Sequence, residues 1–387
     1  MTNRLLVIDD ETDICELIAD VAETRGFDVK TISDPRAVEQ ALLDFKPRSI
    51  ILDLMMPGTD GVELLRNLGD AIRGCGIVLM SGHDLRVLNS AKRLGAAHGI
   101  NVISVLAKPI NITELRETLD TLATLEAKAE SKQTDVSSSK IKVEEIAVFY
   151  QPILDLETNR IRGMEALVRW NHPEHGILAP DLFLERMDAA AMDELADRVM
   201  TIATDDLAKL HEKGFPLAVS INLTASNLID LAVPDRLDDI CKQKNIPNEK
   251  ITIEVTESEA MRDVRRIMDV LTRLRLRGFG VAIDDFGVGY SSLRELQRMP
   301  FNSMKMDKSF VMDMGENRDS QMIANTIIDL GHNLKLKVVA EGIETVSALK
   351  LLKDRGCDLG QGYLISKPVP YEKFLAWITE NAGVFKV

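Results

Sequence analysis

The sequence is poor in aromatic residues and has no excess of positive charge. Aromatic residues make up 4% of the 387 residues, and 61 acidic side chains outnumber 47 basic ones, giving a formal net charge of -14. Proteins that bind nucleic acid through its phosphate backbone need a basic face, and they commonly stack the bases on aromatic rings. The composition therefore argues against a nucleic-acid polymer as partner.

Cysteines and long apolar stretches are also scarce. The four cysteines form no CxxC or CxH motif, which is typical of a reducing compartment and excludes a cysteine-ligated metal site; they are Cys15, Cys75, Cys241 and Cys357. No stretch approaches the roughly 20 apolar residues that span a bilayer. The first residues do not resemble a signal peptide, because three acids follow the short apolar run at 5–8. We expect a cytoplasmic protein with no membrane partner.

What the chain does contain is a regular alternation of apolar runs and amphipathic stretches. In the first 120 residues we expect strands at 5–8, 28–32, 49–52, 76–80 and 102–106, with helix-like segments such as 13–24 between them. Strands that alternate with helices form a parallel, doubly wound sheet, so we predict an α/β fold for this part.

A polar segment separates this part from a larger second one. We predict a first domain over 1–123, a helical tail and flexible linker over 124–145, and a second domain over 146–387. In the second domain the apolar runs lie at 217–221, 251–253, 280–283 and 337–340, with weaker ones at 302–305 and 359–365. About 240 residues of alternating strands and helices suit a TIM-type (β/α)8 barrel.

Polar side chains follow the strands of the first domain where its ligand crevice should lie. Three carboxylates at one edge would repel one another unless Mg²⁺ neutralised them, and a neighbouring lysine and hydroxyl would let one aspartate accept a phosphoryl group. Any one of these residues could instead be a solvated loop-end residue. The set is Asp9, Asp10, Asp53, Ser81 and Lys108.

This set resembles that of the response-regulator receiver domain, a CheY-like, flavodoxin-like fold, over about residues 3–122. The resemblance implies that Asp53 is the phosphoacceptor, with Asp10 the direct Mg²⁺ ligand and Asp9 beside it. It also implies that Lys108 contacts the phosphoryl group and that Ser81 senses it. Val105 stands where the family usually has an aromatic switch residue, which leaves the usual aromatic relay in doubt.

Oxygen ligands also follow successive apolar runs of the second domain. The ends of barrel strands face one mouth, where active sites lie. All-oxygen ligands favour Mg²⁺ or Mn²⁺, and an adjacent Asp-Asp pair can help to hold two ions for phosphodiester hydrolysis. Glu257 could either be a ligand or anchor the loop at 285–292, and Asp307 and Lys308 could be solvated charges. The mouth residues are Glu165, Asn222, Glu254, Asp284, Asp285, Lys305, Glu341 and Gln361.

From about 146 to 385 the chain resembles the EAL-domain phosphodiesterases, which linearise cyclic di-GMP. The motifs that carry the resemblance include 150–153 (YQPI), 165–170 (EALVRW), 284–287 (DDFG), 340–345 (AEGIET) and 361–363 (QGY). The family has an antiparallel first barrel strand, which periodicity here neither predicts nor excludes.

The resemblance assigns a role to each mouth residue. Metal ligands would be Glu165, Asn222, Glu254, Asp284, Asp285 and Glu341, with Asp284 between two ions. Lys305, Glu341 and Glu165 would be catalytic. Gln151, Arg169 and Gln361 would hold the substrate or its water, and Glu257 would support the loop.

Together these features predict a response regulator whose EAL barrel hydrolyses cyclic di-GMP to linear 5′-pGpG by two-metal catalysis, controlled by phosphorylation of Asp53. The implied partners are cyclic di-GMP, a cognate histidine kinase and a second copy in a homodimer or higher homo-oligomer. One alternative is a catalytically silent barrel that binds cyclic di-GMP and signals to a protein partner. Another is a phosphodiesterase for a different nucleotide.

Some residues depart from the family or suggest sites that we do not expect. Val288 stands where threonine or alanine is usual, Thr224 where serine is common, and the stretch at 183–188 keeps only the acid Asp188. His172 and His175 flank Pro173, which breaks any helix that could align them on a metal, so we expect a surface loop there.

Overall fold

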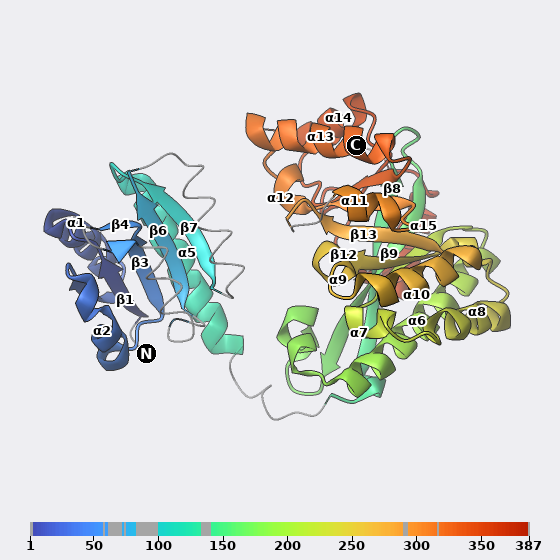
Figure 1. The fold of residues 1–387 in the computed structure, drawn as a ribbon, viewed down its shortest axis with the longest axis horizontal. Coiled ribbons are helices and arrows are strands. Elements are labelled where there is room, and N and C mark those ends of the chain that lie inside the picture. The colour runs from blue at the N-terminus through green and yellow to red at the C-terminus, as the bar shows by residue number, and fades with distance from the viewer. Residues whose placement is uncertain are drawn as a thin grey trace. The chain divides into compact units, whose positions relative to one another are not determined.

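The computed structural model describes residues 3–56, 59–60, 72, 75–82, 100–132, 141–288, 293–315 and 317–385. The chain forms two compact units, Met1–Lys140 and Ile141–Val387 (Figure 1). Of the predicted helical tail and linker at 124–145, residues 124–132 belong to α5 (Ile112–Lys132), and 133–140 lie outside the described residues. Within the described part of the chain, no helix is both long and apolar enough to cross a membrane.

The first unit is built on a five-stranded parallel sheet in the order β2-β1-β3-β6-β7. This order and direction confirm the predicted doubly wound fold. The strands are β1 (Asn3–Ile8), β2 (Phe27–Ile32), β3 (Ser49–Asp53), β6 (Gly76–Ser81) and β7 (Val102–Ala107). Other elements are α1 (Thr12–Glu23), η1 (Pro35–Ala37), α2 (Val38–Phe45), β4 (Met55–Met56) and β5 (Thr59–Asp60).

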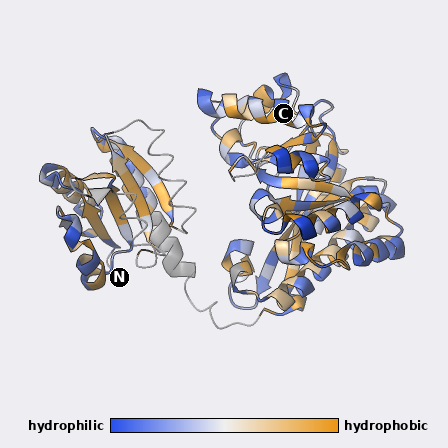
Figure 2. Cartoon of the chain, viewed as in Figure 1, coloured by the Kyte–Doolittle hydropathy of each residue, from blue (hydrophilic) through white to orange (hydrophobic). Residues whose placement is uncertain are grey.

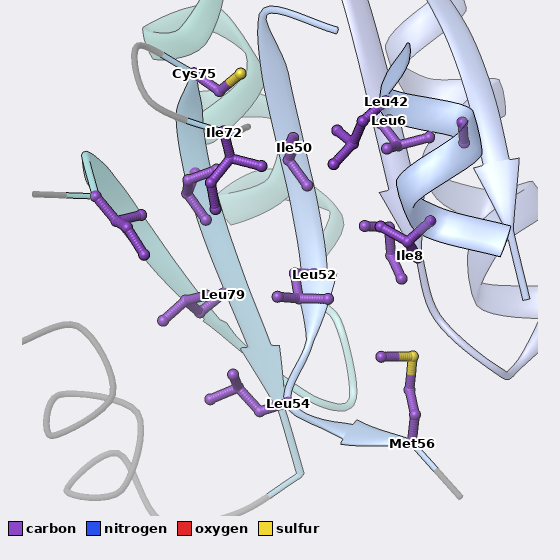
Figure 3. Close-up of a cluster of buried hydrophobic side chains, with 14 residues drawn as sticks. Leu6, Ile8, Leu42, Ile50, Leu52, Leu54, Met56, Ile72, Cys75 and Leu79 are labelled. Carbon is purple, nitrogen blue, oxygen red and sulfur yellow. The ribbon is translucent and has the colours of Figure 1, made fainter. Parts of the chain in front are cut away.

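Both faces of this sheet are buried, which explains why its strands are continuous apolar runs. Successive side chains of a strand point to opposite faces. Leu6 and Ile8 of β1 pack with Leu42 of α2 in one core (Figure 3). Leu5 and Val7 pack with residues of α1 and α5 in the other. The strand ends that carry the polar residues are therefore fixed by two cores.

The second unit is a closed eight-stranded barrel, as predicted. Its first strand runs antiparallel to both neighbours, β9 and β16, and the other neighbouring strands are parallel to each other. The barrel strands are β8 (Ile146–Asp155), β9 (Ile161–His172), β11 (Ala218–Asn222), β12 (Ile251–Thr256), β13 (Gly280–Phe286), β14 (Ser303–Met306), β15 (Lys337–Ala340) and β16 (Leu359–Gly360). The short strands β10 (Gly176–Leu178) and β17 (Val369–Pro370) pair with β9 and β8.

Amphipathic helices surround the barrel. The barrel strands inside are apolar, and the outer faces of the helices are polar (Figure 2). In α10, Ile267, Val270, Leu271 and Leu274 are buried at helical spacing, and Asp263 caps the N-terminus. The longer helices are α6 (Ala189–Glu212), α8 (Val233–Lys244), α10 (Val264–Leu276), α13 (Arg318–Asn333), α14 (Val346–Asp354) and α15 (Tyr371–Glu380). Shorter ones are α7 (Ala225–Leu228), α9 (Glu257–Ala260), α11 (Leu293–Arg298), α12 (Lys308–Val311), η3 (Val143–Glu145), η4 (Pro180–Leu182), η5 (Leu184–Arg186) and η6 (Asn248–Lys250).

Two local expectations were wrong. The weak strand expected at 359–365 is only two residues long, because the chain then turns and exchanges backbone hydrogen bonds with Ile343. His172 is buried and ends β9, rather than lying in a surface loop. Its ring packs edge-on against Trp170, and its Nδ1 accepts hydrogen bonds from the backbone of Glu174 and His175.

Candidate functional site

The barrel brings the predicted mouth residues together at the carboxyl ends of its strands. In strand register, Asn222 lies opposite Glu254, and Thr256 lies opposite Asp284. Gln151 of the antiparallel β8 lies opposite Glu165 of β9. Because each polar residue lies in or directly after a strand with a buried apolar run, the barrel core fixes its position.

Lys305 is the centre of this group. It is 1% exposed, and its Nζ contacts four carboxylates: Glu254 at 2.7 Å, Glu341 at 2.8 Å, Asp284 at 3.1 Å and Glu165 at 3.3 Å. A single ammonium group therefore holds together side chains from four different parts of the barrel. It balances only part of their negative charge.

Two carboxamides complete the arrangement. Asn222 donates from Nδ2 to Glu165 at 2.9 Å. Gln361 donates from Nε2 to Glu165 at 2.7 Å and to Glu341 at 2.8 Å, while its Oε1 is buried and has no hydrogen-bond partner among the described residues. A buried carbonyl oxygen that accepts no hydrogen bond from the protein can accept one from a water molecule, or it can coordinate a cation.

The crowding of acids shifts their pKa values. Burial, aided by neighbouring acids and opposed by Lys305, raises the pKa of Glu341 to about 8 and that of Glu254 well above its usual range. Burial and Asp284 raise the pKa of Asp285 to about 6. Glu165 has a lowered pKa, because Lys305, Gln361 and Asn222 together outweigh its burial. Such acids favour a state in which further cations are bound.

The carboxylates form two groups that suit metal ions. Oxygen atoms of Glu165, Glu254 and Asp284 lie within 4.8 Å of one another, as do those of Asp284, Asp285 and Glu341. Asp284 belongs to both groups. Oxygen donors without cysteine or histidine fit Mg²⁺ or Mn²⁺, and the unpartnered Oε1 of Gln361 lies beside them.

A cavity of about 470 Å³ opens onto this group. Gln151 and Arg169, both predicted to hold substrate, line it. Gln151 donates to the backbone oxygen of Ser366 at 3.0 Å, and Arg169 donates to that of Val168 at 2.7 Å. Sequence analysis assigned no substrate role to three further lining residues, which follow strand ends rather than form part of them: Lys308, Glu344 and Tyr363.

Glu257 contacts the loop that follows β13. Its Oε2 accepts a hydrogen bond from the backbone N–H of Gly287 at 3.0 Å, and neither carboxylate group includes it. Asp307 is not a merely solvated charge, because it is buried and caps α12. Val288 is exposed, and the rest of the predicted loop, 289–292, lies outside the described residues.

The first unit has its own acidic pocket at the ends of β1, β3 and β7. Lys108 Nζ contacts Asp53 at 2.7 Å and Asp9 at 2.9 Å, and oxygen atoms of Asp9, Asp10 and Asp53 lie within 4.8 Å of one another. Lys108 also contacts Glu11 at 3.0 Å. Sequence analysis missed Glu11, although its place directly after the two aspartates was the signal.

Burial shapes this pocket too. Burial raises the pKa of Asp9, although Lys108 opposes the shift. Burial would lower the pKa of Lys108, but its hydrogen bonds to three carboxylates together raise it. Ser81 is buried at the end of β6, and its carbonyl oxygen accepts from the Lys108 N–H at 3.0 Å. Val105 packs against the core shown in Figure 3.

Two protein-family models match the chain. The model for the response regulator receiver domain matches residues 5–120, and the model for the EAL domain matches residues 135–368. The second match covers more than half of the chain.

Curated relatives and solved structures agree with these matches. The cyclic di-GMP phosphodiesterase NbdA of Pseudomonas aeruginosa is 40% identical over 61% of this chain and 31% of its own length. RocR, a cyclic di-GMP phosphodiesterase of the same organism, is 29% identical over 84% of this chain and 85% of RocR.

Among solved structures, the PaMucR phosphodiesterase in complex with c-di-GMP has a TM-score of 0.57 and 32% identity, covering 60% of this chain and 94% of its own. The chain spans only about a third of the length of NbdA.

Proposed function

The chain belongs to the EAL-domain family and carries a receiver domain ahead of its EAL domain, and on this premise we propose that it hydrolyses cyclic di-GMP to linear 5′-pGpG. The observation that carries the proposal is the pair of carboxylate groups that share Asp284 around the buried Lys305. NbdA, RocR and PaMucR, which are named as phosphodiesterases, support the substrate class.

We assign two divalent cations, Mg²⁺ or Mn²⁺, to these groups. Glu165, Asn222, Glu254 and Asp284 would hold the first ion, and Asp284, Asp285 and Glu341 would hold the second. Two such ions, when bound, stabilise the negative charge that develops on the attacking and leaving oxygens of a phosphodiester.

The side chains of the mouth then have separate tasks. Lys305 would orient the attacking water, and its contacts with four carboxylates support this role because they fix the position of its ammonium group. Glu341 would serve the second ion or take the proton of that water as a general base. Gln361 fixes Glu165 and Glu341 and leaves its own oxygen free to accept a hydrogen bond.

Substrate would occupy the cavity beside these groups. Arg169 carries the positive charge suited to a phosphodiester, and Gln151 and Gln361 offer amide groups to the phosphate or the water. Glu257 would support the loop after β13 through Gly287.

For the first unit we propose regulation by phosphorylation of Asp53 by a cognate histidine kinase. Asp9 and Asp10 would hold Mg²⁺ there, Lys108 would contact the phosphoryl group, and Ser81 would sense it. RocR matches both parts of the chain. We further propose domains at 1–123 and 146–387 joined by 124–145, and a homodimer or higher homo-oligomer.

The test is incubation of the purified full chain with cyclic di-GMP and Mg²⁺, with pGpG separated by chromatography. We expect turnover that Glu165→Ala abolishes without loss of folding, whereas Glu157→Ala, at an exposed glutamate outside the cavity, keeps it. Binding of cyclic di-GMP without any turnover would favour the silent effector instead. Equal turnover of cyclic di-GMP, cyclic di-AMP and cyclic AMP would remove the proposed specificity.

A further inference from the structure

Asn222 is a proposed metal ligand at the exposed end of β11. Its Nδ2 donates to Glu165 at 2.9 Å, which leaves Oδ1 for the first ion. A neutral carboxamide attracts a cation less than a carboxylate does, so its oxygen has to be held in the right place before the ion binds. The turn at 223–225, directly after β11, therefore matters for this ligand.

Each backbone N–H of this turn has an acceptor. The N–H of Leu223 donates to the backbone of β12 at 3.0 Å, and the N–H of Thr224 donates to a side chain of the following helix, α7, at 3.2 Å. The N–H of Ala225 donates to Glu259 Oε1 at 3.2 Å. Glu259 lies in α9, which follows β12, so this bond ties the turn to the segment after the neighbouring strand.

Glu259 is itself fixed by that segment. Thr256, the last residue of β12, donates from Oγ1 to Glu259 Oε2 at 2.9 Å. Each oxygen of the carboxylate therefore accepts a hydrogen bond, one from each of two neighbouring strand ends. These strands carry Asn222 and Glu254, which lie opposite each other and are both assigned to the first ion.

Glu259 has no direct part in the proposed chemistry. It belongs to neither carboxylate group and does not line the substrate cavity. It lines a second cavity of about 310 Å³, whose walls are mostly apolar side chains. A water molecule there can replace Glu259 as the acceptor for the Ala225 N–H, but it cannot join the two segments. Loss of this side chain should therefore displace the turn more than it destabilises the barrel.

We propose that Glu259 is a positioning residue that holds Asn222 in place for the first metal ion by joining the segments after β11 and β12. The inference rests on the proposed function and deepens it. Residues that orient a metal ligand from behind typically change metal affinity or activity about 10- to 100-fold when they are replaced.

The test measures metal binding by the barrel of the full chain without using turnover. The protein is stripped with EDTA, freed of EDTA by gel filtration, and melted at increasing Mn²⁺ concentrations. Tryptophan fluorescence follows the melting, because both tryptophans lie in the second unit. An ion that binds the folded state raises the melting temperature. We expect Glu259→Ala to need about 10-fold more Mn²⁺ than the wild type for the same rise.

Two further variants separate geometry from charge. Glu259→Gln loses the charge but keeps the length and an acceptor for the Ala225 N–H, so its Mn²⁺ requirement should lie close to that of the wild type. Glu259→Asp keeps the charge but is one methylene shorter and cannot reach both donors, so it should behave like Glu259→Ala. The opposite order, with Asp close to the wild type and Gln close to Ala, would overturn the proposal.

Lys250→Met is the matched control. Lys250 Nζ donates to the carbonyl oxygen of Pro216 at 2.9 Å, which joins the same two strands at their amino ends, away from the mouth. Loss of this bond should leave the Mn²⁺ requirement unchanged. An equal increase in Glu259→Ala and Lys250→Met would show a general loosening of the barrel and would contradict the assigned role.

A double variant shows whether Glu259 acts through Asn222. Once Asn222→Ala has removed the ligand, Glu259→Ala should raise the Mn²⁺ requirement no further. A further increase of the same size would mean that Glu259 acts on another ligand, against the proposal.

Turnover gives a separate reading. In Glu259→Ala the Mg²⁺ concentration for half-maximal turnover of cyclic di-GMP should rise, while KM at saturating Mg²⁺ stays unchanged. If the wild-type chain binds Mn²⁺ but forms no pGpG, the proposed hydrolysis fails and the melting series still decides the role of Glu259. A wild-type barrel whose melting temperature does not respond to Mn²⁺ would refute that role.

Discussion

Among single residues, Lys305 joins four carboxylates of the barrel mouth. It is buried, and among the described residues it is the one cation in contact with these acids, Glu165, Glu254, Asp284 and Glu341. Each of these acids was placed in the mouth by the apolar run of its strand. The contact of one lysine with all four depends on the closure of the barrel, which no sequence pattern measures.

Replacing Lys305 by methionine should destabilise the metal-free barrel by about 3–5 kcal/mol, because buried carboxylates lose their cation. Unfolding by urea in EDTA, followed by tryptophan fluorescence, measures this directly, since both tryptophans, Trp170 and Trp377, lie in the second unit. Added Mg²⁺ should restore stability to the variant more than to the wild type. Unchanged stability in EDTA would show that the carboxylates do not depend on Lys305.

The raised pKa values predict how the metal-free barrel responds to pH. Glu341 titrates at about 8 and Asp285 at about 6 when folded, against 4.5 and 3.8 ordinarily, so the folded state binds more protons than the unfolded chain between about pH 4 and 8. The stability due to these groups is therefore lost as pH rises through that window. The lowered pKa of Glu165 acts below this window, as pH falls.

Thermal unfolding in EDTA across pH 5–9 tests this, with Glu341→Gln expected to flatten the slope. A stability that rises steadily with pH would contradict the assigned shifts.

The residues that sequence analysis missed share a location. Lys308 and Glu344 follow β14 and β15, Tyr363 follows β16, and Glu11 follows β1. Apolar periodicity predicts where a strand ends, but it does not predict which of the next few side chains turns toward the mouth. That direction depends on the local backbone path, as at Asp285, whose φ of 52° is left-handed.

At the scale of elements, the turn after β16 carries Gln361 into the mouth through a very close backbone approach. A Cβ at Gly362 would overlap the backbone nitrogen and oxygen of Ile343, which cannot yield as a flexible side chain can. The backbone hydrogen bonds from Ile343 to Gln361 and from Leu364 to Ile343 fix the same crossing. Only glycine fits at position 362, because the backbone of Ile343 leaves no space for a Cβ.

Gly362→Ala should therefore destabilise the barrel by about 3 kcal/mol and displace Gln361. Gly356→Ala is the matched control, because its φ is +74° but nothing lies within 4 Å, so only a backbone cost of about 1–2 kcal/mol applies. Urea unfolding of both variants decides the matter. Equal losses of unfolding free energy in the two variants would mean that the close approach to Ile343 does not contribute to the cost of Gly362→Ala.

Elements with clear periodicity could be predicted from the sequence, and others could not. The strands β11, β12, β13 and β15 match their apolar runs closely. The antiparallel direction of β8 came from the family resemblance, because direction leaves no trace in periodicity. The strand β16 is shorter than expected, because Gln361 and the glycines beside it form the close backbone crossing with Ile343 and do not continue the β-sheet pairing.

For the whole molecule, we propose that phosphorylation at the acidic pocket of the first unit controls hydrolysis in the barrel. Lys108 contacts Asp9, Glu11 and Asp53, so a phosphoryl group on Asp53 would compete with two other carboxylates for this lysine. That competition gives phosphorylation a direct electrostatic effect within the first unit.

Incubation with acetyl phosphate and Mg²⁺ should label the full chain once, and Asp53→Asn should abolish the label. Intact-protein mass spectrometry measures both. Glu39→Gln, at an exposed acid in the same unit, is the control and should be labelled like the wild type. A label that survives Asp53→Asn would remove Asp53 from its role.

Hydrolysis at the two carboxylate groups that share Asp284 can be tested in a single metal-addition experiment. The full chain is stripped with EDTA, mixed with cyclic di-GMP, and then given Mg²⁺ while pGpG is followed over time. We expect no product before the metal is added and steady formation of pGpG after it. Asp284→Asn, which removes a ligand from both groups at once, should form none. Folded wild-type protein that binds the dinucleotide with Mg²⁺ present and yet forms no pGpG would contradict it.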